Sequence, residues 1–301
     1  MVAPDDPPID DPILESLARR RNVAAAFAVF FFLIIVVTGA LDLTTAVTED
    51  RTFTVGASPR LIVHDRVGGG LRGAIEVHAG ADSRLRVEGE VHGTWRVRYR
   101  LEQRGDDVVI EVYPRPFLGW LNLLGPARFT VTAPAQTRLD IQSVSAPIEV
   151  QGIAGGGSVR TTNGGIHLDG AKGILSAVTT NGAVIATGFD GSATLQTTNG
   201  AIDVHGGRGS FDVTTTNGAI VLDAELDSRG RHRAETTNGS VSVRLHGEPS
   251  LRVDARTTNG AVLAHRAVAI REQATNSLTG TIGAGEGTLS IHTTNGRIVI
   301  E

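Results

Sequence analysis

The 301-residue chain has no cysteine and only 4% aromatic residues, and Lys172 is its only lysine. Without cysteine it can form no disulfide, no thiolate metal site and no cysteine nucleophile. Scarce aromatic residues together with 37 glycines argue against a helix bundle and for many turns around narrow, β-branched interior positions. A formal net charge of -4 indicates neither nucleic acid nor an acidic lipid surface as a partner.

The sequence also lacks recognisable catalytic and ligand-binding motifs. None of the nine histidines forms a His-x-His or His-x-x-x-His pair of the kind that binds metals. The glycine runs 68–70 and 155–157 are not followed by the lysine and helix of a phosphate-binding loop, and no nucleophile elbow is present. We therefore predict no enzyme activity, no metal and no cofactor.

Long uncharged runs that are also strongly apolar are absent except for one, at residues 23–41. Its length is about the 20 residues that a helix needs to cross a bilayer, so we predict a single-pass transmembrane helix that contacts the lipid bilayer. The alternatives are a cleaved signal peptide, for which the run is long and Thr44-Thr45-Ala46 a poor cleavage site, and a buried core helix. Residues 1–22 are acidic and rich in proline, which predicts a disordered tail.

Charges on either side of this run set its expected orientation. Arg19, Arg20 and Arg21 precede it, whereas Asp42, Glu49 and Asp50 follow it. By the positive-inside rule the amino terminus is cytoplasmic and the domain after the run is extracytoplasmic, which predicts a cell-membrane protein.

Residues 50–135 show short alternating apolar and polar runs and are expected to form a membrane-proximal β region. Gly105-Asp106-Asp107 separates two such runs and predicts a hairpin. Residues 116–126 break the pattern because apolar residues stand at both odd and even positions. We expect either a plug over the open end of the β structure or an exposed interaction loop. The candidate interaction residues are Phe117, Leu118, Trp120, Leu121, Leu123 and Leu124.

Residues 136–301 are dominated by a repeated Thr-Thr-Asn-Gly tetrapeptide. Steps of 18, 18, 18, 21, 21 and 36 residues separate its copies, and apolar residues recur at fixed places on both sides of it. A fixed period of this kind is typical of a solenoid, in which each repeat is one stacked unit. The asparagines of the seven copies are Asn163, Asn181, Asn199, Asn217, Asn238, Asn259 and Asn295.

The tetrapeptide is predicted to be the bend of each coil. Its glycine would supply a positive φ, its asparagine a side-chain ladder between coils, and its first threonine an inward position. The same register predicts two coils without the motif, at 143–150 and 278–282. The fold class is therefore all-β: a single-stranded parallel β-helix of about nine coils, on the order of 40 Å long, behind a β-rich cap region.

The sequence ends directly after the last motif, so residues 295–301 are expected to form an exposed edge that a second copy or a partner strand could pair with.

Strands that end in Thr-Val-Thr-Ala-Pro (130–134), followed by repeated strand, Asn-Gly, strand units, resemble the bacterial adhesin-like domain of β-strand repeats. The resemblance covers roughly residues 50–301 as one continuous domain. It implies a cell-envelope protein, with adhesion and envelope-stress signalling as the suggested roles and no catalytic residues to carry over.

The predicted function is a non-enzymatic, membrane-anchored envelope protein that presents a β-solenoid for adhesion, binding or envelope structure. One alternative is a polysaccharide-acting enzyme in which Asp203 approaches Asp212 or Asp223 on neighbouring coils. The other is an envelope-stress signalling component, whose short tail would need a partner to carry the signal.

Overall fold

The computed structural model describes residues 23–34, 36–37, 47–67, 73–81, 83–92, 97–114, 127–265 and 268–301. The predicted tail 1–22 and the predicted interaction loop 116–126 lie outside the described residues. Residues 23–34 and 36–37 are helical. Among the residues described, no helix combines the length and the apolar character that crossing a bilayer requires.

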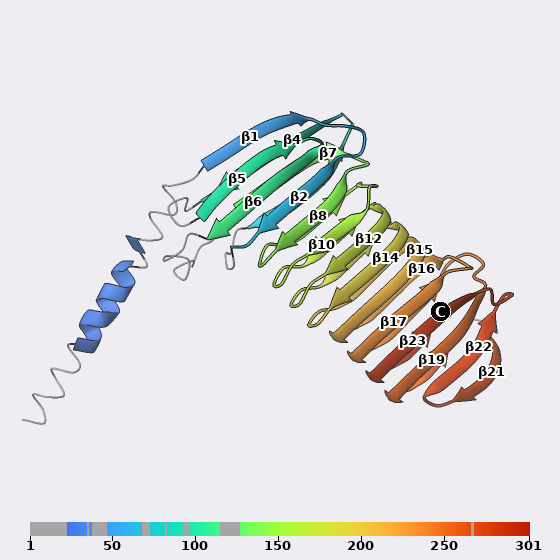
Figure 1. Ribbon diagram of the computed structural model, residues 1–301. Coiled ribbons are helices and arrows are strands. Elements are labelled where there is room, and N and C mark those ends of the chain that lie inside the picture. Colours follow the sequence, from blue (N-terminus) through green and yellow to red (C-terminus); the bar gives the residue numbers. More distant parts are fainter. Residues whose placement is uncertain are drawn as a thin grey trace, which may run out of the picture.

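All the remaining described structure is β (Figure 1). The strands of the amino-terminal part are β1 (Val47–Thr54), β2 (Arg60–Asp65), β3 (Ala74–Gly80), β4 (Arg84–Val91), β5 (Val97–Arg104), β6 (Asp107–Pro114) and β7 (Ala127–Pro134). The predicted hairpin is confirmed, because β5 pairs antiparallel with β6 around Gly105, which has a φ of 63°. β1, β4 and β7 pair in antiparallel fashion as well.

The repeats form two faces that enclose the core. The first face holds the strands that precede each asparagine: β8 (Arg138–Ser143), β10 (Gly157–Arg160), β12 (Lys172–Val178), β14 (Asp190–Thr197), β17 (Arg231–Asn238), β19 (Leu251–Asn259) and β23 (Gly287–Asn295). The second face holds the strands that follow: β9 (Ile148–Gln151), β11 (Ile166–Asp169), β13 (Val184–Thr187), β16 (Ile220–Leu226), β18 (Val241–Leu245), β20 (Val262–Ala264) and β24 (Ile298–Ile300). β15 (Ile202–Asn217) belongs to both faces, since its first half pairs with β13 and its second half with β14.

Strand pairing between successive repeats is parallel and in register, as the period predicts. Ile148, Ile166, Val184 and Ile202 are consecutive partners on the second face. The pairing of β9 with β11 confirms the coil predicted at 143–150. Side chains alternate between the core and the solvent, so each strand contributes two or three apolar residues to a narrow interior.

One hydrophobic core runs through the cap region and the repeats, from Val55 to Ile300. The two parts are continuous because β2 pairs with β8 and β3 pairs with β9, both in parallel. Phe189 and Phe211 meet edge to face inside the core, with ring centroids 6.0 Å apart. Most other buried core residues are valine, isoleucine, leucine and alanine, which confirms an interior built mainly from slim residues.

The stack does not follow the order of the sequence at its far end. β23 lies between β17 and β19 on the first face (Figure 1). On the second face β24 pairs with β18 on one side and with β20 on the other. The expectation that residues 295–301 form an exposed edge is therefore wrong. These residues are paired on both sides because the last repeat inserts between two earlier ones.

The predicted coil at 278–282 is also wrong. These residues belong to β22 (Ser277–Ile282), which pairs antiparallel with β19 and with β21 (Ala269–Ala274). Residues 278–282 fit the register of the motif, but an antiparallel strand presents the same alternation of apolar and polar residues. The hairpin β21–β22 closes the first face at the far end of the stack.

Candidate functional site

The seven asparagines form one continuous row of side-chain hydrogen bonds along the edge between the two faces. In each step an amide nitrogen (Nδ2) donates to the amide oxygen (Oδ1) of the neighbouring asparagine, over distances of 2.8–2.9 Å. The order along the row is Asn163, Asn181, Asn199, Asn217, Asn238, Asn295 and Asn259. The last two positions follow the inserted repeat and not the sequence.

The first threonine of each motif adds a second row just inside the asparagines. All seven of these threonines are buried. The hydroxyl of Thr179 donates to the carbonyl of Gly164 over 2.8 Å, and that of Thr215 to the carbonyl of Gly200 over 2.9 Å. The sequence predicts the inward position of these side chains, but the choice of a glycine carbonyl as partner carries no sequence signal.

The motif glycines allow this close stacking. A Cβ built on Gly182 would lie 2.0 Å from the carbonyl oxygen of Gly164, and one on Gly218 would lie 1.9 Å from that of Gly200. The prediction that they supply a positive φ is wrong, since none of the motif glycines has one. Positive φ occurs instead at the second bend of the coils, at Gly152, Gly170, Gly188 and Gly206, with φ between 58° and 70°.

We call these residues the Thr-Asn-Gly spine: the first threonine, the asparagine and the glycine of each of the seven motifs. The asparagine amides bond one another, and the threonine hydroxyls bond backbone carbonyls of the neighbouring coil. Each hydrogen bond of this kind contributes on the order of 1 kcal/mol. A catalytic site needs one unique arrangement, whereas this arrangement repeats at each coil. The spine is a structural element.

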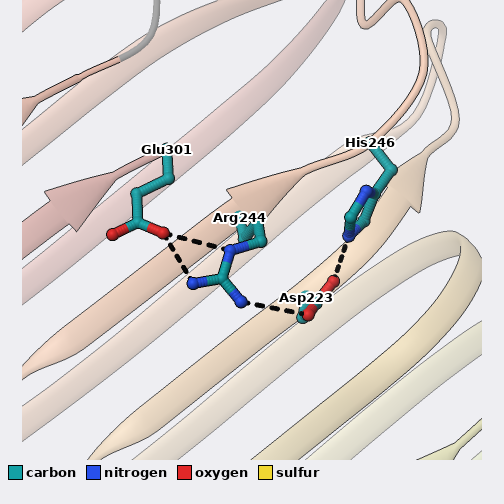
Figure 2. Close-up of polar contacts among 4 residues, drawn as sticks. All are labelled: Asp223, Arg244, His246 and Glu301. Atoms are coloured by element: carbon teal, nitrogen blue, oxygen red, sulfur yellow. Dashed lines mark hydrogen bonds and ion pairs between the residues drawn. The ribbon is translucent and has the colours of Figure 1, made fainter.

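A distinct polar cluster occupies the second face at the inserted repeat (Figure 2). Arg244 at the end of β18 lies between two carboxylates, with its Nη2 2.7 Å from Glu301 and its Nη1 3.4 Å from Asp223. His246 contacts Asp223 through Nε2. The four residues come from three neighbouring strands or the turns after them, so the cluster ties the inserted β24 to β18 and β16.

The electrostatics of this cluster are those of a surface ion pair. The hydrogen bond and charge of Glu301, with a smaller contribution from Asp223, raise the pKa of Arg244 above its ordinary value. The Arg244 side chain is 53% exposed, and ion pairs at such exposed positions contribute roughly 0–1 kcal/mol each. No serine hydroxyl bonds His246 among the described residues, so the Asp223–His246 pair is not part of a nucleophilic triad there.

The carboxylates proposed for a polysaccharide-acting enzyme do not all lie together: Asp223 is on the same face as Asp203, two register positions along the neighbouring strand β16, but Asp212 is not. Asp203 lies in the first half of β15 on the second face, whereas Asp212 lies in the second half on the first face. Asp223 is already engaged by Arg244 and His246. Within the described residues, no three His, Asp or Glu side chains are grouped closely enough to hold a metal ion.

Two titratable groups are buried inside the stack. Burial raises the pKa of the Asp65 carboxyl, which accepts hydrogen bonds from the Val67 amide and the Ser143 hydroxyl. Burial lowers the pKa of His232, whose Nε2 lies 2.8 Å from the carbonyl of Asp227 and whose Nδ1 accepts from the Phe211 amide. Both groups bond backbone or core atoms, so they support bends of the coils.

Two faces of parallel strands, an edge of stacked asparagines and one shared core define a β-solenoid protein. Within that class the chain belongs to the Toastrack DUF4097 family, whose pattern matches residues 74–301. No curated protein matches the chain.

Three solved structures of low sequence identity resemble it. A "putative cell adhesion protein" from Clostridium sporogenes is 14% identical, covers 84% of this chain and 99% of its own, and gives a TM-score of 0.28. A "putative adhesin" from Bacteroides fragilis is 11% identical over 85% of this chain and 97% of its own, with a TM-score of 0.36. A "putative lipid binding protein" from Parabacteroides distasonis is also 11% identical, over 84% and 97%, with a TM-score of 0.39. Identities and TM-scores this low carry no argument about function.

Proposed function

We propose that this protein is a non-enzymatic component of the cell envelope, in which residues 23–41 anchor a stiff β-solenoid that presents its outward faces for binding. The proposed topology places the amino terminus in the cytoplasm and the solenoid outside. The family supports an adhesin-like fold, and the alternation of the strands supports two solvated faces around one core.

The observation that carries the proposal is the surface of the helical segment. Nine large apolar side chains between Val23 and Val37 are 50–69% exposed, and none of them belongs to the hydrophobic core. On a water-exposed surface, large apolar side chains normally occur one at a time and not in a dense group. A helix that is apolar on all sides therefore needs an apolar environment around it. The three arginines that precede it favour the cytoplasmic side for the amino terminus.

The Thr-Asn-Gly spine supports the proposal that the solenoid is stiff. Stacked amides, buried threonine hydroxyls and glycine-to-carbonyl contacts repeat along the length of the repeats. An element of this kind keeps its side chains at fixed positions, which suits a surface that is recognised from outside.

The test is membrane association of the full chain. We expect the protein to remain in the membrane pellet after an alkaline carbonate wash, and external protease to digest the solenoid in intact cells. The double variant Phe30→Arg, Val36→Arg places two charges in the proposed anchor, at roughly 3 kcal/mol each near the bilayer centre, and should release the protein. The matched control is Ile174→Arg, which changes an 80% exposed apolar residue of the solenoid and should leave the protein in the pellet.

Release of the unaltered protein by carbonate, or equal behaviour of the two variants, would contradict the anchor. Protection of the solenoid from external protease would contradict the orientation.

A further inference from the structure

A groove of about 620 Å³ crosses the first face near the start of the repeats, over β8, β10 and β12. Its lining includes Arg60, Arg138 and Arg160, the hydroxyl residues Ser158, Ser176 and Thr194, and one carboxylate, Asp140. We call it the arginine groove. The three hydroxyl residues are consecutive register partners on β10, β12 and β14, so they form a straight row across the strands.

Three glycines beside this groove let neighbouring backbones approach closely. A Cβ on Gly155 would lie 2.3 Å from the carbonyl oxygen of Thr137, and one on Gly157 would lie 2.1 Å from that of Leu139. Gly156, with φ at 65°, packs equally closely on Ile174. Because no side chain fits at these positions, the strand beside β12 leaves Ile174 uncovered, and its side chain is 80% exposed.

The charges of the groove are unbalanced. Arg60 and Arg138 are direct register partners on β2 and β8, where like charges are unfavourable. Arg60 is paired with Asp140 over 2.6 Å. Neither Arg138 nor Arg160 has an ion pair with a carboxylate in the described part of the chain, and Arg160 bonds only the Ser158 hydroxyl there.

Guanidinium groups with no carboxylate partner, held beside a hollow, are suited to an oxyanion, because their planar fork binds carboxylates and phosphates through two hydrogen bonds. The row of hydroxyls adds neutral donors and acceptors at intervals of about 4.8 Å, the spacing of the strands. Successive rings of an extended polysaccharide repeat at a comparable spacing, and the exposed Ile174 offers an apolar contact for a ring face.

We propose that the arginine groove binds an anionic polysaccharide, with Arg138 and Arg160 on its acidic groups and Ser158, Ser176 and Thr194 on its hydroxyls. This inference rests on the proposed function, since it requires the solenoid to lie outside the cell. It assigns a ligand class to one place on the first face.

The test measures binding of immobilised full-chain protein in detergent micelles to polygalacturonate, with uncharged dextran as the reference polymer. We expect polygalacturonate to bind and dextran not to bind. The double variant Arg138→Gln, Arg160→Gln should weaken binding at least tenfold and reduce its dependence on salt. Ser176→Phe places a bulky side chain in the groove without a change of charge and should weaken binding to a similar degree.

The matched control is Arg252→Gln on the same face, which removes an arginine outside the groove. Equal weakening by Arg252→Gln would show general charge attraction and overturn the proposal. Binding of dextran as strong as that of polygalacturonate would overturn it as well. Binding to phosphatidylglycerol vesicles in place of polygalacturonate would replace the glycan with a lipid surface.

Circular dichroism and the unfolding midpoint of each variant identify loss of fold, and a variant that unfolds is replaced by Arg138→Lys, Arg160→Lys. Lysine keeps the charge but loses the two-pronged hydrogen bond, so the proposal expects it to weaken binding by several-fold, and unchanged binding would overturn it. The groove variants should leave membrane association unchanged. A failure of the carbonate test therefore concerns the anchor, and a failure of polygalacturonate binding concerns the groove.

Discussion

Gly164 and Gly165 stand side by side in the first motif but meet different surroundings. A Cβ on Gly164 would lie 2.2 Å from the carbonyl oxygen of Ala146, whereas one on Gly165 meets only the Ala183 carbonyl at 3.4 Å. Alanine already occupies the position of Gly165 in the next three coils. A comparison of the two glycines therefore distinguishes two roles of glycine: Gly164 allows a close approach of two backbones, whereas Gly165 adds only conformational freedom.

We predict that Gly164→Ala destabilises the protein by roughly 2 kcal/mol or more, because the extra atom forces two coils apart. Gly165→Ala is expected to be neutral or to stabilise by about 0.5 kcal/mol, through a less flexible unfolded chain. Urea unfolding of both variants measures the difference. If both behave alike, close approach is not what the motif glycine provides.

The two threonines of one motif offer a second matched pair. Thr215 is buried and its hydroxyl donates to the Gly200 carbonyl, whereas Thr216 points outward. Thr215→Val keeps the shape of the side chain but leaves a carbonyl without its donor, so we expect a loss of about 1 kcal/mol. Thr216→Val should change the free energy of unfolding by less than about 0.5 kcal/mol. If the buried hydroxyls do not contribute to stability, both variants will have the free energy of unfolding of the unaltered protein.

His232 makes stability depend on pH. Burial lowers its pKa in the folded protein, so the unfolded chain binds the proton more tightly. Its contribution to stability is complete above the unfolded pKa of about 6.5 and is lost as pH falls below that value. We expect the unfolding free energy to fall between pH 8 and pH 5, and to fall less in His232→Gln, which can still donate to the Asp227 carbonyl. An identical pH dependence in the two proteins would contradict this role.

At the residue scale, the sequence predicts the features that depend on the alternation of inward and outward side chains along a strand. It predicted the inward threonines because period 2 fixes which side chains face the core. It could not predict why glycine follows asparagine, since a positive φ and a close backbone approach require the same residue. Only the distance between coils separates the two causes.

At the scale of elements, β19 and β20 are attached to the rest of the stack through the inserted pair β23–β24. β19 pairs with β23 on one side and β22 on the other, and among the described strands β20 pairs with β24 alone. We predict that removal of residues 287–301 releases residues 251–286 as well, because those strands lose the neighbour that joins them to β17 and β18.

Limited proteolysis followed by mass spectrometry tests this: the truncated protein should be cut back to about the end of β18 (Val241–Leu245). A stack in sequence order would lose only its final coil. Resistance of residues 251–264 to the protease would contradict the prediction. The variant Arg244→Gln is the milder control, because it removes one exposed cluster residue without removing a strand and should leave 251–286 protected.

The order of the strands in the stack could not be predicted from the sequence, for a physical reason. Each repeat presents the same apolar places and the same asparagine, so any coil can pair with any other at equal register. Asn238 hydrogen-bonds Asn295 with the same geometry as it would offer to Asn259. The 36-residue step between the last two motifs signals a change, but it does not state which coil is the neighbour.

At the scale of the whole molecule, the chain end and the end of the rod are different places. The amide of Ile298 donates to the Ala261 carbonyl and that of Glu301 to the Val243 carbonyl, which shows pairing on both sides of β24. β21 pairs on one side only and is exposed along its whole length. The true edge of the stack, among described residues, is therefore near β20 and β21.

We predict that hydrogen exchange follows position in the rod. Amides of β24 should exchange as slowly as those of β13 and β16 in the middle, whereas amides of β21 should exchange orders of magnitude faster, because its hairpin can open without disturbing the core. Mass spectrometry of exchanged peptides covers both segments. Fast exchange of β24 would indicate fraying of the carboxyl-terminal residues and contradict the inserted position.

The inserted repeat also bears on how the protein is made. Residues 251–264 leave the ribosome before residues 287–300, yet β23 and β24 lie between them and the earlier coils. Coils up to β18 can add one after another during synthesis, each on the face left by its predecessor. In the final structure the next segment pairs with β23 and β24 and not with β17 and β18, so this end of the rod reaches its native order only after residues 287–300 have been made. For a chain that crosses a membrane during synthesis, the final closing of the stack then takes place on the far side.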